Sequence, residues 1–233
     1  MIKKAGMLII IFLFITSGAF SLAKMPEIDR DNWVSISGEI DREKAEEVIL
    51  ALMNLDSKPG TAPIGIRISS PGGSLMAVMA ICDTIKNLRH PVVTLALGEA
   101  ISGAAVILSC GDERFIGDYT MVMLHQPSVI FENWSSNFEE LQQFTLALGK
   151  IENQMYRLLA QNTGKSEEEI KKLLKKEVWF TAKEAIEFGL ADELLSEGGL
   201  RIKEEPVEPE EEEKEEKEKS DTFPSSQSCQ SLK

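Results

Sequence analysis

Apolar and polar positions alternate with two different periods in the middle of the chain, which predicts strands followed by helices. The segment 66–70 and the mostly apolar segment 92–97 are predicted to be strands, and each is followed by a glycine-containing corner. Helical apolar spacing follows the first corner at residues 75–88, and an uncharged run follows the second as far as Gly111. The pattern therefore predicts two successive strand-to-helix corners, each rich in glycine.

Further helices are predicted from residues that suit helix ends. A serine or threonine stands three residues before a glutamate in three places, as in a capping box: Ser136 and Glu139, Ser166 and Glu169, and Thr181 and Glu184. Asp41 is expected to cap an earlier helix, and Gly189 to end the last one. The helix after the first box is predicted to be long, reaching about Gln161.

A serine at the second corner is the leading candidate for chemistry. Ser102 lies among the small residues of 98–105 and would open the helix that follows the strand. The first N–H groups of a helix are unpaired, so a nucleophile and an oxyanion site can be built together there. Tight packing of a helix on a sheet is the alternative reason for such small residues. The glycine corner near Gly73 and the histidine at His125 favour a catalytic site.

Four segments of the chain resemble the ClpP family of serine peptidases, and they occur in the family's order. They are SPGGS at 70–74, GEAISGA at 98–104, MVMLHQP at 121–127 and FTAKEAIEFGLAD at 180–192, within a similarity that runs from about residue 33 to about residue 195. The resemblance implies an α/β protein with the ClpP/crotonase-like fold of repeated strand-turn-helix units and a protruding handle helix. It also implies hydrolysis of peptide bonds without a cofactor, and a homo-oligomeric ring around a chamber.

Carried over to this chain, the resemblance makes Ser102 the nucleophile and His125 the general base. The N–H groups of Gly73 and Gly103 would hold the oxyanion. Where the family has an aspartate that orients the histidine, this chain has Glu177, whose extra methylene displaces the carboxylate. Three outcomes are open: a Ser-His-Glu triad, a slower Ser-His dyad, or another acid in this role. A solvated surface carboxylate is the alternative for Glu177, because two lysines precede it.

The long helix carries an apolar stripe with two interpretations. The stripe consists of Leu141, Phe144, Leu148, Ile151, Met155 and Leu158. In the resembling family this region is a handle that docks one ring onto another, which would make the stripe a subunit contact. An ordinary core-facing stripe is the alternative.

The N-terminus predicts export. Two lysines precede the apolar run 7–15, and small residues follow, with Ser21 and Ala23 at the two positions that a signal peptidase reads. Residues 1–23 are therefore expected to be a signal peptide, and the mature protein to be periplasmic or extracellular. A retained N-terminal membrane anchor is the weaker alternative, because the run is shorter than the about 20 residues of a membrane span.

The rest of the chain is expected to form one peptidase domain, residues 24–201, followed by an acidic disordered tail, residues 202–233. The tail is dominated by glutamate, which cannot bury enough apolar surface to fold. The net charge of the whole chain is −13. This charge argues against binding to nucleic acid or to an anionic membrane surface.

The three cysteines do not make a disulfide framework. Cys82 and Cys110 lie in apolar helical segments and are expected to be buried thiols rather than a bridge or a nucleophile. Cys229 lies in the tail and is the thiol most open to reaction. No paired cysteine and histidine spacing indicates a metal site.

The sequence thus predicts an exported serine endopeptidase that hydrolyses peptides or unfolded proteins. Export would separate it from ATP, so we expect it to act without ATP and without an unfoldase partner. One rival is a crotonase-like acyl-CoA enzyme, since that fold also places paired N–H groups on an oxyanion. The other is a catalytically silent ClpP-like subunit or scaffold, which the departure at Glu177 leaves open.

Overall fold

Strands and helices alternate through the first half of the protein, as the apolar periods predict. The computed structural model describes residues 27–128, 137–198 and 201–203. The strands are β1 (Glu27–Asp29), β2 (Trp33–Ser37), β3 (Ile64–Ser70), β4 (Val92–Ile101), β5 (Glu113–Ile116), β6 (Met121–Leu124), β7 (Val178–Phe180), β8 (Glu193–Leu194) and β9 (Arg201–Lys203). The helices are η1 (Arg30–Asn32), α1 (Arg42–Asp56), α2 (Leu75–Asn87), α3 (Gly103–Leu108), α4 (Phe138–Thr163), α5 (Glu167–Leu173), α6 (Ala182–Phe188) and α7 (Leu195–Gly198).

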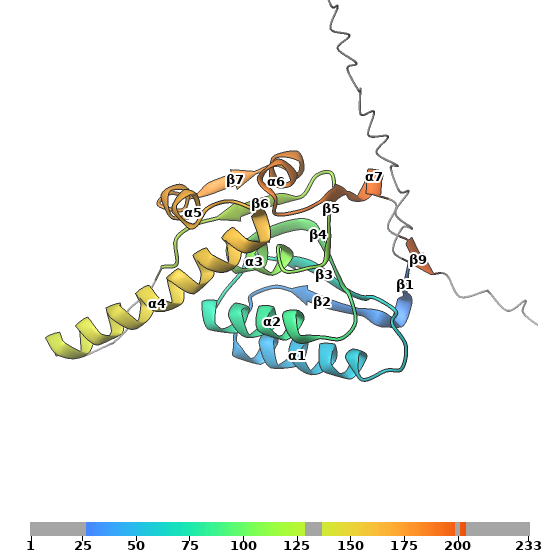
Figure 1. Cartoon of the computed structure of the whole chain (residues 1–233), viewed down its shortest axis with the longest axis horizontal. Helices are drawn as coiled ribbons and strands as arrows, with labels where there is room; N and C mark the ends of the chain where they lie inside the picture. The colour runs from blue at the N-terminus through green and yellow to red at the C-terminus, as the bar shows by residue number, and fades with distance from the viewer. Residues whose placement is uncertain (1–26, 129–136, 199–200, 204–233) are drawn as a thin grey trace, which may run out of the picture.

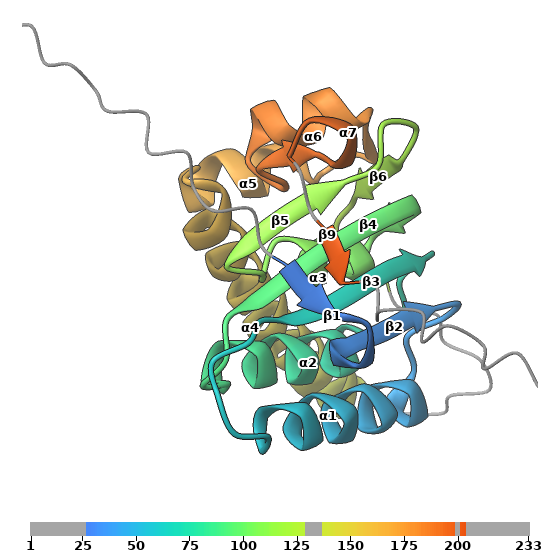
Figure 2. The same ribbon diagram turned by 90° about the vertical axis from the view of Figure 1, so that its right-hand side faces the viewer.

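A seven-stranded sheet forms the centre of the fold (Figure 1). Its main path has the order β2-β3-β4-β5-β8, and β6 pairs with both β4 and β7. All pairs in it are parallel except β6 with β7, which is antiparallel. Helices α1 and α2 lie side by side along this sheet, and β1 pairs with β9 in a small second sheet (Figure 2). The predicted α/β class is confirmed.

Strand β4 divides the sheet and carries the chain to the second corner. Its residues 93–96 pair with β5, whereas its residues 99–101 pair with β6. Gly98 lies between the two parts with a φ of +79°, and the register against β3 shifts there. Such an irregularity bends a strand, so β4 continues past the end predicted at Leu97. The bend turns the end of β4, and Ser102 after it, toward β6.

The main core lies between the sheet and helices α1, α2, α3 and the C-terminal half of α4. All six residues of α3 are buried, which explains the uncharged run after Ser102. Among the largest fully buried side chains are Ile36, Leu52, Ile66, Ile81, Ile107 and Leu108. Burial of each such side chain contributes about 1.5–3 kcal/mol to the free energy of unfolding.

The helix ends follow the predicted caps with one displacement. Asp41 accepts a hydrogen bond from the N–H of Lys44 at 2.8 Å, and Gly189 ends α6 with a φ of +97°. Two of the predicted capping boxes are present, Ser166 with Glu169 and Thr181 with Glu184. The first prediction is wrong by one residue: Asn137 and Glu140 form the box before α4, and Ser136 lies outside the described residues. Asparagine caps a helix as well as serine does, so the pattern could not distinguish the two.

Helix α4 projects from the body of the protein, as the resemblance implied (Figure 1). Its C-terminal half packs on the core through Met155, Leu158 and two neighbours. Near its other end, Leu141, which belongs to the apolar stripe, is 41% exposed, and Phe138 and Leu146, which lie outside the stripe, are 82% and 56% exposed. The apolar stripe therefore faces the core over only part of its length, and a subunit contact stays a prediction for the rest.

The predicted signal peptide at residues 1–23 and residues 204–233 of the predicted tail lie outside the described residues. Ile202 and Lys203, which the predicted tail includes, instead pair with β1 as part of β9. Within the part of the chain that is described, no helix combines the length and the apolar character that crossing a membrane requires.

Candidate active site

Ser102 stands at the corner between β4 and α3 in an uncommon backbone conformation. Its φ is +57° and its ψ is −118°, and it is the only residue other than glycine with a positive φ among the described residues. A conformation of this kind costs about 1–3 kcal/mol and persists only where the surroundings impose it. The N–H of Ser102 donates to the carbonyl oxygen of Met123 at 2.7 Å, which holds the corner against β6. The serine side chain is consequently presented at the end of a strand.

His125 directly follows β6 and faces this serine. Its Nε2 atom lies 2.8 Å from Oγ of Ser102. Parallel pairing of β4 with β6 aligns Ile101 with Met123, which brings the residues after both strands to the same edge of the sheet. In a neutral imidazole whose Nε2 carries no proton, that atom accepts a hydrogen bond from the serine hydroxyl. The pair therefore has the contact that general-base activation of a serine requires.

The two glycine corners touch each other. A Cβ atom built on Gly103 would lie 3.7 Å from the nitrogen of Gly73 and only 2.4 Å from Cγ2 of Val78. A Cβ on Gly72 would lie 2.9 Å from the nitrogen of Gly103. Only glycine permits this approach of the two backbones, and it brings the N–H-bearing atoms of Gly73 and Gly103 into one neighbourhood. The structure thus brings together four of the five residues predicted for the site: Ser102, His125, Gly73 and Gly103.

The first corner is held in place by Ile40, which the sequence analysis did not identify. Its N–H donates to the carbonyl of Gly72, and its carbonyl accepts from the N–H of Ser74, both at 2.8 Å. A Cβ on Gly73 would lie 2.3 Å from that carbonyl oxygen, so position 73 requires glycine. Ile40 acts here through its backbone atoms. Such a contact does not depend on the type of side chain, so the sequence gives no signal for it.

A pocket of about 640 Å³ opens over the serine and the histidine. Gly73, Gly103, Ser102 and His125 all line it. Its apolar lining includes residues of α2, α3 and α4 together with residues at the ends of β4 and β6: Leu75, Met76, Val106, Leu148, Ile151, Met155, Ile101, Met123 and Leu124. Glu39 is the only carboxylate among the lining residues that are described. The pocket can therefore receive an apolar group beside a reactive hydroxyl.

Glu177 lies near His125 along the backbone, but its side chain is exposed. Antiparallel pairing of β6 with β7 aligns Leu124 with Val178. His125 follows Leu124 and Glu177 precedes Val178, so the two residues are neighbours in the same register. The described residues show no hydrogen bond between the Glu177 carboxylate and the imidazole. The role of this glutamate stays a prediction.

No cluster of three or more metal-ligating side chains occurs within the described ranges.

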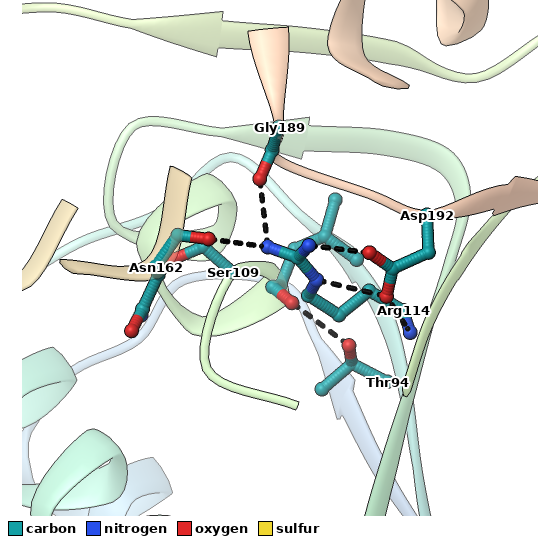
Figure 3. Close-up of polar contacts among 7 residues, drawn as sticks. Thr94, Ser109, Arg114, Asn162, Gly189 and Asp192 are labelled. Atoms are coloured by element: carbon teal, nitrogen blue, oxygen red, sulfur yellow. Dashed lines mark hydrogen bonds and ion pairs between the residues drawn. The ribbon is translucent and has the colours of Figure 1, made fainter. Parts of the chain in front are cut away.

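Behind the site, Arg114 of β5 joins three parts of the chain (Figure 3). One of its terminal nitrogens, Nη1, donates to the carbonyls of Asn162 at 2.9 Å and Gly189 at 2.7 Å. Its Nε donates to the carboxylate of Asp192 at 3.0 Å, and its other terminal nitrogen also contacts that carboxylate. The guanidinium therefore holds the ends of α4 and α6 against β5.

The same network reaches the end of α3 (Figure 3). Nδ2 of Asn162 donates to Oγ of Ser109 at 3.1 Å, and Oγ1 of Thr94 donates to the carbonyl of Leu108 at 2.8 Å. These bonds satisfy polar groups at the buried C-terminus of the short helix that begins at Gly103. They help to hold α3, and with it the serine corner, in position.

Comparison with known proteins identifies one family. The family model described as Clp protease matches residues 18–198. The chain is 34% identical over 180 residues to the ATP-dependent Clp protease proteolytic subunit 2 of Frankia casuarinae, which covers 76% of this chain and 82% of the relative. It is 34% identical over 165 residues to proteolytic subunit 4 of Rhodococcus jostii, covering 70% and 84%. It is 35% identical over 164 residues to proteolytic subunit 1 of Rhodopirellula baltica, covering 70% and 71%.

Proposed function

The chain belongs to the Clp protease family, and from that premise we propose that it is a serine endopeptidase acting through Ser102 and His125. The observation that carries the proposal is the 2.8 Å contact between Nε2 of His125 and Oγ of Ser102. Both residues line one pocket, in which a peptide carbonyl can approach both groups. A hydroxyl in this position is a nucleophile with its base already in place.

The reaction would follow the usual course of acyl transfer to serine. Nε2 of His125 takes the hydroxyl proton while Oγ of Ser102 attacks the peptide carbonyl carbon. The N–H groups of Gly73 and Gly103 donate to the oxyanion that forms. The protonated imidazole then gives its proton to the leaving amine, and water, activated by the same imidazole, releases the acyl group. Each oxyanion donor in such a site contributes about 10²–10³ in rate.

The exposure of Glu177 supports a Ser-His dyad over a Ser-His-Glu triad. A carboxylate orients a catalytic histidine only when it accepts a hydrogen bond from the other ring nitrogen. The imidazole is held in this protein by the strand before it and by the residue after it. Gln126 donates its N–H to the carbonyl of Leu174 at 2.9 Å, next to the end of α5.

The lining of the pocket supports substrates with apolar side chains. Leu75 and Met76 come from α2, and Ile151 and Met155 from α4, so an apolar group would be enclosed from two sides. Glu39 would repel an acidic group at the same place. We propose peptides and unfolded proteins as substrates. A folded protein buries most of its apolar side chains and does not offer an extended segment that could enter the pocket.

We further propose that the protein is exported and acts without ATP. Support comes from the signal-like segment at residues 1–23, and the proposal departs from the relatives, whose names describe them as ATP-dependent. The N-terminal residue of the mature protein tests cleavage of a signal peptide: a start at Lys24 supports it, and a start at Met1 contradicts it. Recovery of the protein only in the cytoplasmic fraction would contradict export. Peptide hydrolysis by the purified protein alone tests ATP independence. A requirement for an added ATPase would contradict it.

Self-assembly into a homo-oligomeric ring is proposed on the same premise. The projecting part of α4 exposes Phe138 and Leu146, and large apolar side chains on one element favour a contact between subunits. The mass of the particle in solution, measured by light scattering, tests this. A monomer at micromolar concentration would contradict it.

Labelling with a fluorophosphonate probe tests the catalytic assignment most directly. Such a probe forms a covalent bond only with a nucleophile that is activated. We expect labelling of Ser102, its loss in Ser102→Ala, and a strong decrease in His125→Ala. Peptide hydrolysis should fall in parallel. Absence of both labelling and hydrolysis from the folded protein would favour a catalytically silent subunit, whereas turnover of acyl-CoA without labelling would favour the crotonase-like rival.

A further inference from the structure

Two buried thiols lie in contact between α2 and the turn that follows α3. Cys82 is 1% exposed and Cys110 is 9% exposed, and both are free, as the sequence predicts. Their sulfur atoms lie 2.9 Å apart, although the residues are separated by 28 positions in the chain. A disulfide has an S–S distance of about 2 Å. The two sulfurs would therefore have to approach by less than an ångström to be bonded.

We propose that Cys82 and Cys110 form an intramolecular disulfide when the protein meets a disulfide oxidant, which makes this pair a site of redox modification. The thiolate of Cys110 attacks one sulfur of an oxidant R–S–S–R, forms a mixed disulfide and releases one R–S⁻. The thiolate of Cys82 then attacks the sulfur of Cys110 and releases the second R–S⁻. The two cysteines lose two protons and two electrons, and the oxidant leaves as two thiols.

The surroundings favour Cys110 as the attacking group. Hydrogen bonding with Cys82 lowers the pKa of the Cys110 thiol against the opposing effect of burial, and the positive charge of Lys86 lowers it further. Asn162 also contributes, with Nδ2 at 3.6 Å from the sulfur. The same contact between the thiols, together with burial, raises the pKa of Cys82. A thiolate is the reactive form, and Cys110 is also the more exposed of the two.

The bridge would join α2 to the turn that directly follows α3, and these two helices begin at the two glycine corners. Helix α2 follows the corner of Gly73, and α3 begins at Gly103, with Val78 of α2 packed against that glycine. A bond between Cys82 and Cys110 would close a loop containing all of β4 and Ser102. The bond would limit how far the corners of Gly73 and Gly103 can move apart when the protein unfolds on heating. It would not itself contact a substrate.

Burial of both sulfurs slows their reaction in the folded protein, so the step is expected to be faster during folding. This order fits a protein that folds in oxidising surroundings after export, and to that extent it rests on the proposed export. The chemistry itself needs only the contact between the two thiols and the oxidant.

The test uses the full chain and glutathione disulfide. The reduced protein is incubated with the oxidant, either folded or during refolding from urea, then alkylated, digested and analysed by mass spectrometry. We expect a linked peptide pair containing Cys82 and Cys110, and a rise in Tm on the order of 10 °C that a reductant reverses. The linkage should persist in Cys229→Ser and vanish in Cys82→Ser and Cys110→Ser.

Failure to find this linked pair in either arm would overturn the proposal, and so would a linkage of Cys229 to one of the two. A linked pair without any change in Tm would overturn the inferred restriction of the two corners. Fluorophosphonate labelling of Ser102 is measured on the same samples. Because the linkage is read from peptide masses, its failure is distinguishable from a failure of the proposed peptidase function.

Discussion

The backbone N–H of Ser102 donates a hydrogen bond to the carbonyl oxygen of Met123, at 2.7 Å. Met123 lies two residues before His125, so this bond determines how far the serine corner stands from the imidazole. It continues the parallel pairing in which Ile101 is aligned with Met123. The contact between the two side chains therefore depends on the register of β4 and β6. A shift by one residue would turn the histidine to the opposite face of the sheet.

Replacement of Gly103 by alanine is expected to reduce kcat/KM by on the order of 100-fold, the effect of losing one oxyanion donor. The added Cβ would lie 2.4 Å from Cγ2 of Val78, so one of the two must shift, and we expect the start of α3 to move and to carry the N–H group with it. The measurement is peptide hydrolysis together with urea unfolding, which verifies that the variant folds.

The double variant Gly103→Ala with Val78→Ala removes the clashing methyl group. We expect it to recover a large part of the lost activity, and Val78→Ala alone to stay within a few-fold of the original protein. A double variant as inactive as Gly103→Ala would show that the packing of α2 on α3 does not determine the position of this N–H group.

Ser102→Gly is expected to be more stable toward unfolding than Ser102→Ala, by about 1 kcal/mol. Glycine adopts a φ of +57° without steric cost, whereas alanine keeps the strain of the serine. Both variants lack the hydroxyl, so the comparison isolates the backbone. Urea unfolding of the two proteins measures it, and equal stabilities would mean that the corner is not strained.

Removal of the Glu177 carboxylate is expected to leave peptide hydrolysis within about threefold of the original rate. Its side chain is exposed, and the described structure gives it no hydrogen bond to His125. Glu177→Ala and Glu177→Asp are compared under the same conditions. A loss on the order of 10²-fold or more in Glu177→Ala, with recovery in Glu177→Asp, would establish the triad instead.

Local patterns in the sequence predicted the parts of the fold that local forces determine. The strand that ends at Ser70 and the helix from Leu75 lie where apolar spacing places them. The end of β4 was predicted at Leu97 because a glycine follows. In the folded protein, Gly98 bends the strand rather than ending it, since pairing with β3 and β6 continues on its far side.

Contacts between distant segments could not be predicted in this way. Strands β1 and β9 have three residues each and pair across the length of the described chain, so neither carries a pattern of its own. Ile40 holds the first corner through backbone atoms, and Val78 requires glycine at position 103 only because α2 packs on α3. The residue pattern indicated Ser102, the corner of Gly73 and His125, and the resemblance supplied their roles and the other predicted site residues, whereas the packing that holds them appears only in the fold.

Replacement of Arg114 by methionine is expected to lower the free energy of unfolding by about 2–3 kcal/mol. Its side chain is 14% exposed, and its loss would leave the carbonyls of Asn162 and Gly189 without their donor. Arg89→Met is the matched control, because the Arg89 side chain in its ion pair with Asp56 is 69% exposed. Exposed ion pairs contribute about 1 kcal/mol or less to the free energy of unfolding. If urea unfolding shows the same loss for Arg114→Met and Arg89→Met, burial of Arg114 does not make its contacts stronger.

The two capping boxes of Ser166 and Thr181 are expected to make stability depend on pH in the acidic range. Hydrogen bonds from the backbone N–H, and then from the hydroxyl, of these residues lower the pKa of Glu169 and Glu184 in the folded protein. A glutamate in an unfolded chain has a pKa of about 4.3. Because the folded pKa is the lower one, the stabilisation is complete above that value and is lost as the pH falls through the folded pKa.

The double variant Glu169→Gln with Glu184→Gln should therefore lose less Tm between pH 7 and pH 3 than the original protein does. Glutamine keeps an amide oxygen that accepts the same hydrogen bonds, so the caps persist while their titration is removed. Glu187→Gln, on the exposed side of α6 and outside both boxes, is the control for removal of a negative charge. If the control narrows the difference in Tm as much as the double variant does, net charge rather than the capping boxes is responsible for the pH dependence.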